Sequence, residues 1–198
     1  MMGYALVCII LKTMRARICT ALALTTQLKI NANVGFILRM VKYYNAMVVF
    51  EEIPNEITLA INITNCPCHC KGCHSKFLWE DVGTELDGWA IDELVKKNDG
   101  VTCVCFMGGD NDPMYIDKMA AYVKYGLKLK VGWYSGRDNI SQFVDLAHFD
   151  YVKIGHYDEE RGSLDKETTN QILYKVCREG DKQWVEDITH MFWKKGKE

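Results

Sequence analysis

The sequence predicts an α/β protein built from parallel βα units. Between residues 57 and 155, segments with the alternation of strands are followed by segments with the periodicity of helices. This order is typical of parallel sheets with crossover helices. The length of 198 residues suits one domain with a buried core. A loop unusually rich in cysteine follows the first predicted strand.

The first half of the predicted sheet surrounds this loop. Apolar side chains alternate with small or polar ones over residues 57–64, which predicts a strand. Asp87 is a candidate N-cap for a helix that ends near residues 98–100. A short apolar run over residues 101–106 predicts a buried strand, and the turn 107–110 follows it.

The second half repeats the pattern. Asp112 caps the next predicted helix, with proline at its first position, and Gly126 ends it. The strand after it ends at the turn 133–136. A helix over residues 140–147 and a strand over residues 151–155 complete another unit.

Three loops of special composition follow the predicted strands. They are the cysteine loop 66–73, the turn at Gly108-Gly109 and the turn at Ser135-Gly136. Ligand-binding loops of parallel sheets gather at the carboxyl ends of the strands. We therefore expect these three loops to form one site.

Composition narrows the class of protein. Four of the nine cysteines lie within eight residues, and the total is odd, which favours a cytoplasmic protein that uses thiols as ligands. The formal net charge of −2 gives no electrostatic reason to expect nucleic acid as a partner. The early apolar run Tyr4–Leu11 is far shorter than the ~20 residues of a membrane span, so no membrane partner is expected.

Residues 1–39 are interpreted as an N-terminal extension and residues 40–198 as the main domain. The apolar run in the extension also has the character of a signal peptide, with a weak cleavage site at Ala21-Leu22-Ala23. No positive charge precedes that run, and export would expose the thiols to oxidation. We therefore favour an upstream extension over a signal peptide, with translation able to start at Met40 or Met47, and we expect residues 1–39 to be dispensable.

The cysteine spacing indicates a metal or cluster site. Cys66, Cys70 and Cys73 are separated by three and two residues. Three thiolates can hold three irons of a [4Fe-4S] cluster and leave the fourth iron open. Zinc is the rival: Cys70 and Cys73 form a knuckle, and Cys103 and Cys105 offer a second pair on one side of a strand. These last two also fit as small core residues.

Three further side chains in the loop lie outside the three-thiolate pattern. Cys68 is interpreted as a loop residue, with substitution as a ligand as the alternative. His69 and His74 are not assigned as ligands of the metal.

The spacing of Cys66, Cys70 and Cys73 resembles the motif of radical S-adenosylmethionine (SAM) enzymes. The resemblance implies a partial (β/α) barrel of parallel βα units, radical SAM type, with a [4Fe-4S] cluster and SAM as cofactors. In that family the open iron chelates SAM, and an electron from the cluster cleaves SAM to methionine and a 5′-deoxyadenosyl radical. Hydrogen abstraction by this radical needs no side-chain acid or base, so no catalytic residue is assigned.

The resemblance also implies which residues contact SAM. His74 follows the third cysteine, where the family often places an aromatic ring near the adenine. The Gly-Gly-Asp turn resembles the family's glycine-rich turn, although Asn111 and Asp112 stand where the family usually has proline. The full set of cofactor-binding residues expected on this basis is Gly72, Cys73, His74, Gly108, Gly109, Asp110 and Ser135.

From about Met40 to the carboxyl end the chain resembles activating proteins of the anaerobic ribonucleoside-triphosphate reductase. The matching segments are 66–79, 107–110, 149–155, 168–171 and 187–189. The resemblance implies that the chain installs a glycyl radical on the large reductase subunit, with an electron donor such as a flavodoxin. The alternatives are an activase of another glycyl-radical enzyme, such as pyruvate formate-lyase, and a small zinc-binding interaction protein.

Overall fold

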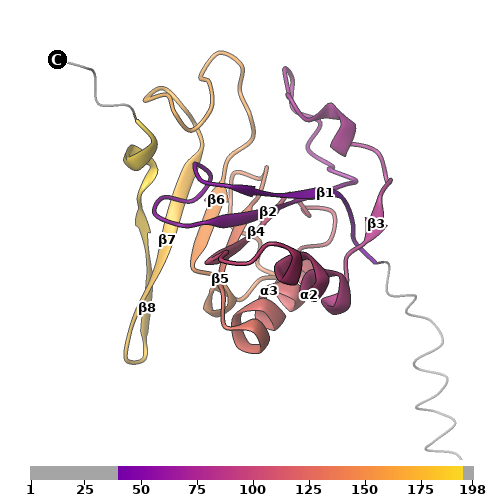
Figure 1. The fold of residues 1–198 in the computed structure, drawn as a ribbon. Coiled ribbons are helices and arrows are strands. Elements are labelled where there is room, and N and C mark those ends of the chain that lie inside the picture. Colours follow the sequence, from indigo (N-terminus) through magenta and orange to yellow (C-terminus); the bar gives the residue numbers. More distant parts are fainter. Residues whose placement is uncertain (1–39, 194–198) are drawn as a thin grey trace, which may run out of the picture. The chain divides into compact units, whose positions relative to one another are not determined.

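The structure, a computed structural model, describes residues 40–193. The expectation that residues 1–39 are dispensable lies outside this part. An eight-stranded mixed sheet forms its centre, in the order β3-β1-β2-β4-β5-β6-β7-β8 (Figure 1). The strands are β1 (Lys42–Val49), β2 (Thr58–Ile63), β3 (Thr84–Glu85), β4 (Cys103–Met107), β5 (Lys130–Tyr134), β6 (Tyr151–Ile154), β7 (Ile172–Glu179) and β8 (Lys182–Asp187).

The four central strands are parallel. Thr58 at the start of β2 pairs with Cys103 of β4, and Cys103 pairs with Lys130 of β5. β6 continues the parallel set beside β5. These are the four strands that the sequence predicts between residues 57 and 155, and their existence is confirmed.

The predicted partial (β/α) barrel is wrong. β1 and β3 extend one side of the sheet by antiparallel pairing, and β7 and β8 form an antiparallel hairpin on the other side. Only two α-helices occur in the described residues, α2 (Gly88–Lys97) and α3 (Pro113–Ala121). A barrel of βα units needs a crossover helix before each new parallel strand. Here the chain after β6 turns back on itself instead.

Both α-helices begin at the predicted caps. The Asp87 carboxylate accepts a hydrogen bond from the Ala90 amide at 2.8 Å, and Asp112 accepts one from the Tyr115 amide at 3.0 Å. After α3 the chain makes a π-helical turn, Tyr122–Leu127. Lys128, at φ 60°, ends that turn, so the predicted stop at Gly126 is two residues early.

The predicted helix at residues 140–147 is wrong. Only a short 3-10 turn, Leu146–His148, forms there. The Arg178 guanidinium of β7 donates to the Leu146 carbonyl at 2.7 Å and also binds the carbonyls of Ala147 and Phe149. Because these carbonyls are bound from outside, they do not need helical partners.

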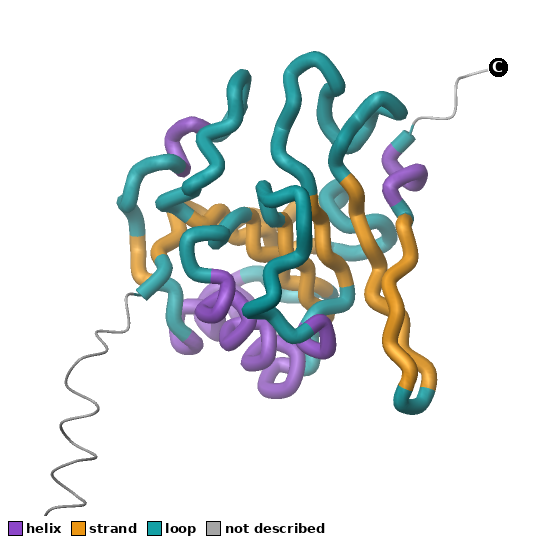
Figure 2. The backbone as a smooth tube through the Cα atoms, turned by 180° about the vertical axis from the view of Figure 1, so that it is seen from behind, coloured by secondary structure: helices purple, strands orange, loops and turns teal. Residues whose placement is uncertain are grey.

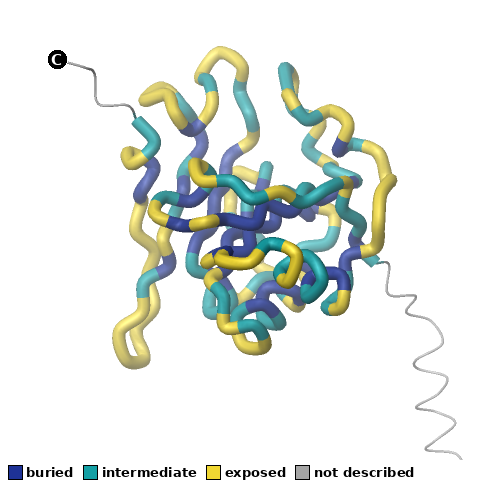
Figure 3. Tube along the Cα trace, in the orientation of Figure 1, coloured by how far each residue is buried: buried dark blue, intermediate teal, exposed yellow. Residues whose placement is uncertain are grey.

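The two faces of the sheet have different covers. α2 and α3 lie together on one face (Figure 2), where the larger apolar cluster includes Ile61, Phe106 and Trp133. The other face carries a smaller cluster that includes Ile53 and Cys105. Buried positions follow the central strands, whereas the tip of the β7–β8 hairpin is exposed (Figure 3). Among residues 40–193, no helix has the length and apolar character that a membrane crossing requires.

Candidate functional site

One carboxylate joins the three predicted loops at the carboxyl ends of the strands. Asp110, after β4, accepts hydrogen bonds from the Ser135 hydroxyl at 2.5 Å and from the Gly136 amide at 2.8 Å. The Cys68 sulfur lies 3.8 Å from the same carboxylate. The expectation that the cysteine loop, the glycine turn and the Ser135-Gly136 turn meet is therefore confirmed.

Cys68 lies inside this junction rather than at the surface of its loop. A Cβ added at Gly136 would lie only 2.7 Å from the Cys68 sulfur, so only glycine lets the loop pack this closely. The single Cys68 thiol hydrogen has two acceptors within reach, the Asp110 carboxylate and the Cys66 sulfur. Cys68 therefore connects the cysteine loop to the other two.

The contact between Cys66 and Cys68 separates their acidities. The hydrogen bond from Cys68 lowers the pKa of the Cys66 thiol, although burial opposes the change. The same bond, together with burial and the nearby Asp110 carboxylate, raises the pKa of Cys68. Cys66 is therefore the more readily ionised thiol of the pair, as a metal ligand must be.

The three predicted cluster ligands have suitable chemistry but do not converge. Cys66, Cys70 and Cys73 are free thiols and half-buried. Among the described residues, no group of three His, Cys, Asp or Glu side chains is close enough to hold a single metal ion. By ligand type, the three thiols suit either an iron–sulfur cluster or zinc.

Cys103 and Cys105 do not complete a zinc site with the loop. Both are fully buried in the smaller apolar cluster, and burial raises the pKa of each thiol. Cys103 pairs with Thr58 at the start of β2, at the opposite end of that strand from the cysteine loop. The interpretation of these two cysteines as core residues is confirmed.

The glycine turn is shaped by protein contacts. Gly108 and Gly109 have φ angles of 104° and 93°, which favour glycine. A Cβ on Gly109 would lie 2.4 Å from Ile116 of α3. The Gly108 carbonyl accepts a hydrogen bond from the Trp133 indole at 2.8 Å. Packing against α3 therefore accounts for glycine at 109, whatever the turn binds.

The remaining predicted residues occupy the edge of the site. Gly72 has φ 73°, and a Cβ added there would face the Glu159 side chain. The His74 ring meets Tyr157 edge-on at 5.3 Å and is exposed. Ser135 is buried, with its hydroxyl on Asp110. His74 and Gly72 thus contact the segment after β6, whereas Ser135 belongs to the central junction.

Lys153 is a site residue that sequence reasoning did not single out. Its ammonium donates to the Gly155 carbonyl at 2.7 Å and lies 3.5 Å from the Ser135 carbonyl. Burial lowers the pKa of Lys153 to about 8, against the opposing effect of Asp110 and Cys70. A lysine between Val152 and Ile154 in an apolar strand was the available signal, because buried lysines are rare.

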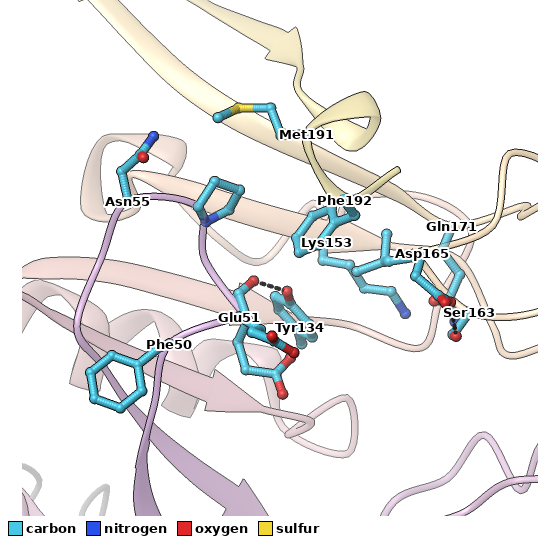
Figure 4. Close-up of a pocket in the computed structure, with 13 residues that line it drawn as sticks. Phe50, Glu51, Asn55, Tyr134, Lys153, Ser163, Asp165, Gln171, Met191 and Phe192 are labelled. Atoms are coloured by element: carbon cyan, nitrogen blue, oxygen red, sulfur yellow. Dashed lines mark hydrogen bonds between the residues drawn. The ribbon is translucent and has the colours of Figure 1, made fainter. Parts of the chain in front are cut away.

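Two hollows adjoin the junction. One of about 380 Å³ lies between the cysteine loop and the segment after β6, and Cys68, Cys70 and Tyr157 line it. A larger one of about 670 Å³ lies on the face opposite α2 and α3, and Tyr134 and Lys153 line it (Figure 4). Both volumes are in the range of small-molecule and cofactor sites.

Comparison with protein-family models, curated proteins and solved structures finds no match to this chain.

Proposed function

We propose that the chain is a cytoplasmic radical SAM activase that generates a glycyl radical on the large subunit of the anaerobic ribonucleoside-triphosphate reductase. The observation that carries the proposal is the meeting of a C-x3-C-x2-C loop with a glycine turn and a Ser-Gly turn at one carboxylate, Asp110. The resemblance of the same segments to activases of this reductase supports the choice of partner.

Each residue of the junction has a proposed task. Cys66, Cys70 and Cys73 would hold a [4Fe-4S] cluster, whose chemistry when bound is the one-electron cleavage of SAM. Asp110 fixes the Ser135 hydroxyl and the Gly136 amide, which keeps these loops in place beside the cysteines. Asp110 and Ser135 are buried, which keeps water away from this part of the junction, as radical chemistry requires.

The test begins with the cofactors. After anaerobic reconstitution the chain should hold about four irons with matching sulfide, and with reductant it should convert SAM to methionine and 5′-deoxyadenosine. Colourless protein that retains zinc and leaves SAM intact would instead favour the zinc-binding interaction protein.

The second test addresses the partner. Mixing the chain with the reductase, SAM and a reductant such as reduced flavodoxin should yield a glycyl-radical doublet in electron paramagnetic resonance. Alanine at the target glycine should abolish the doublet, and deuterium at its α-carbon should appear in 5′-deoxyadenosine. Activation of pyruvate formate-lyase but not of the reductase would redirect the proposal to that partner.

A further inference from the structure

The hollow of about 670 Å³ is a built cavity next to the junction. Its floor is formed by the ends of β5 and β6, and the segment 50–55 and the turn with Phe192 rise around it (Figure 4). The Tyr134 hydroxyl donates to the Glu52 carbonyl and holds that segment over the opening. Tyr134 directly precedes Ser135, so the cavity and the junction share a strand end.

Two largely buried polar side chains line this cavity, and not all of their hydrogen-bonding groups have partners in the described chain. Gln171 is 7% exposed, and within residues 40–193 its side-chain amide makes no hydrogen bond. Lys153 is also 7% exposed and is held by backbone carbonyls, with no carboxylate in ion-pair range in the described chain. Both side chains therefore have hydrogen-bonding capacity left for a ligand in the cavity.

The mouth of the cavity indicates the kind of ligand. Phe50 is 69% exposed and Met191 is 46% exposed, and both line the opening. Exposed Phe and Met at a cavity rim are typical of surfaces that a protein partner covers. A small metabolite inside the cavity would leave this apolar rim in water.

The charge at the mouth is negative. Glu51 and Glu52 line it, and in the described residues neither carboxylate has a hydrogen-bonding or ion-pairing partner. Asp165 also lines the cavity but is already paired with Lys166 at 3.4 Å. Two unpaired carboxylates against one lysine disfavour an acidic ligand and favour a basic one.

We infer that this cavity binds an extended segment of a protein partner that carries a basic residue. Backbone groups of the segment bind Lys153 and Gln171, and the basic side chain binds Glu51 and Glu52. If the proposed function holds, on which this identity rests, the segment belongs to the reductase subunit. The preference for a basic residue does not depend on that function.

The experiment compares two fluorescent nine-residue peptides, blocked at both ends, by anisotropy with the full chain. They are identical except for one residue beside a central glycine, which is lysine in one and glutamate in the other. The lysine peptide should bind about threefold to fivefold more tightly, the range of a partly exposed ion pair. The preference should disappear in Glu51→Gln/Glu52→Gln and persist in Asp181→Asn, a change in the exposed turn between β7 and β8.

A second variant tests the interior of the cavity. Gln171→Ala should weaken both peptides by a similar factor, because it removes a backbone contact and leaves the charge unchanged. Three outcomes would overturn the inference. The double variant could keep the preference for the lysine peptide, Asp181→Asn could lose that preference to the same extent as the double variant, or neither peptide could bind. SAM cleavage in the same variants separates the two claims. Cleavage without peptide binding removes only the inference, whereas peptide binding without cleavage removes only the proposed function.

Discussion

The two ends of the four parallel strands use their polar side chains differently. At the amino ends, Glu56 accepts hydrogen bonds from Thr102 at 2.7 Å and from Tyr151 at 2.8 Å, and it pairs with Lys130. At the carboxyl ends, the described cysteines form no disulfide, and the Gln171 side-chain amide has no hydrogen-bond partner among the described residues. One end is a closed network that stabilises the sheet. The other retains binding capacity, as functional sites commonly do.

The largest expected effect concerns only the site at the carboxyl ends of the parallel strands. Serine at Cys66, Cys70 or Cys73 should remove most of the iron from the reconstituted chain, because each position would lose a thiolate ligand. Unfolding in urea before reconstitution should change little, since these side chains are half-buried in a loop.

Cys68→Ser is the matched control for the cysteine variants. A serine hydroxyl still reaches toward Asp110, so the loop contact survives and the iron should be retained. Loss of iron in Cys68→Ser, with retention in one of the other three, would show that the ligand set is assigned wrongly.

The next largest effect concerns the Glu56 network at the amino ends of the parallel strands. Glu56→Ala should lower the free energy of unfolding by about 2–4 kcal/mol, because it leaves the buried Tyr151 hydroxyl without its acceptor and also removes the hydrogen bonds from Thr102 and Lys130. Urea denaturation followed by circular dichroism measures this change. Glu167→Ala, at an exposed position, should stay within about 0.5 kcal/mol. A Glu56→Ala variant as stable as the control would show that the network contributes nothing.

A smaller effect separates packing from ligand binding at the glycine turn. Gly100 has φ 87° with no neighbour within 4 Å of an added Cβ, whereas Gly109 would meet Ile116 at 2.4 Å. Gly100→Ala should cost about 1 kcal/mol from backbone strain alone, and Gly109→Ala about 1–2 kcal/mol more. Equal losses in urea would refute the close packing. A defect in SAM binding at Gly109 is interpretable only after this correction.

The smallest effect is the pH dependence of the stability that the Glu56 network contributes. Burial raises the pKa of Glu56, but hydrogen bonds from Lys130, Thr102 and Tyr151 outweigh it and hold the pKa below its usual 4.5. The network therefore contributes fully above pH 4.5 and weakens as the pH falls through the lower native value. Urea midpoints between pH 6 and 3 should fall less steeply in Glu56→Gln. Parallel curves for the two proteins would remove Glu56 from the acid response.

The sequence predicted the local elements well where the signals were local. The caps at Asp87 and Asp112 form because a side-chain carboxylate and an amide three residues later are enough to start a helix. The alternation over residues 57–64 produced β2 for the same reason. The meeting of three loops was predictable because parallel strands bring their carboxyl ends to one edge.

The C-terminal hairpin was missed although the sequence contains a signal for it. β8 is exposed at every position, so no apolar alternation marks it. Its pairing is guided instead by cross-strand contacts such as Lys175 opposite Glu186. The Gly180-Asp181 turn, with Gly180 at φ 57°, was the available signal for a tight hairpin.

The sequence by itself determined the four parallel strands, the two capped helices and the cysteine spacing, because each depends on residues close together in the chain. The tertiary structure decided how the sheet continues after β6, since β7 and β8 add to it antiparallel, and Arg178 binds carbonyls of the predicted helix. It also decided that Asp110 joins Cys68 to Ser135, which lie far apart in sequence. Contacts of this kind depend on side chains that meet only once the sheet has formed, and no local pattern encodes them.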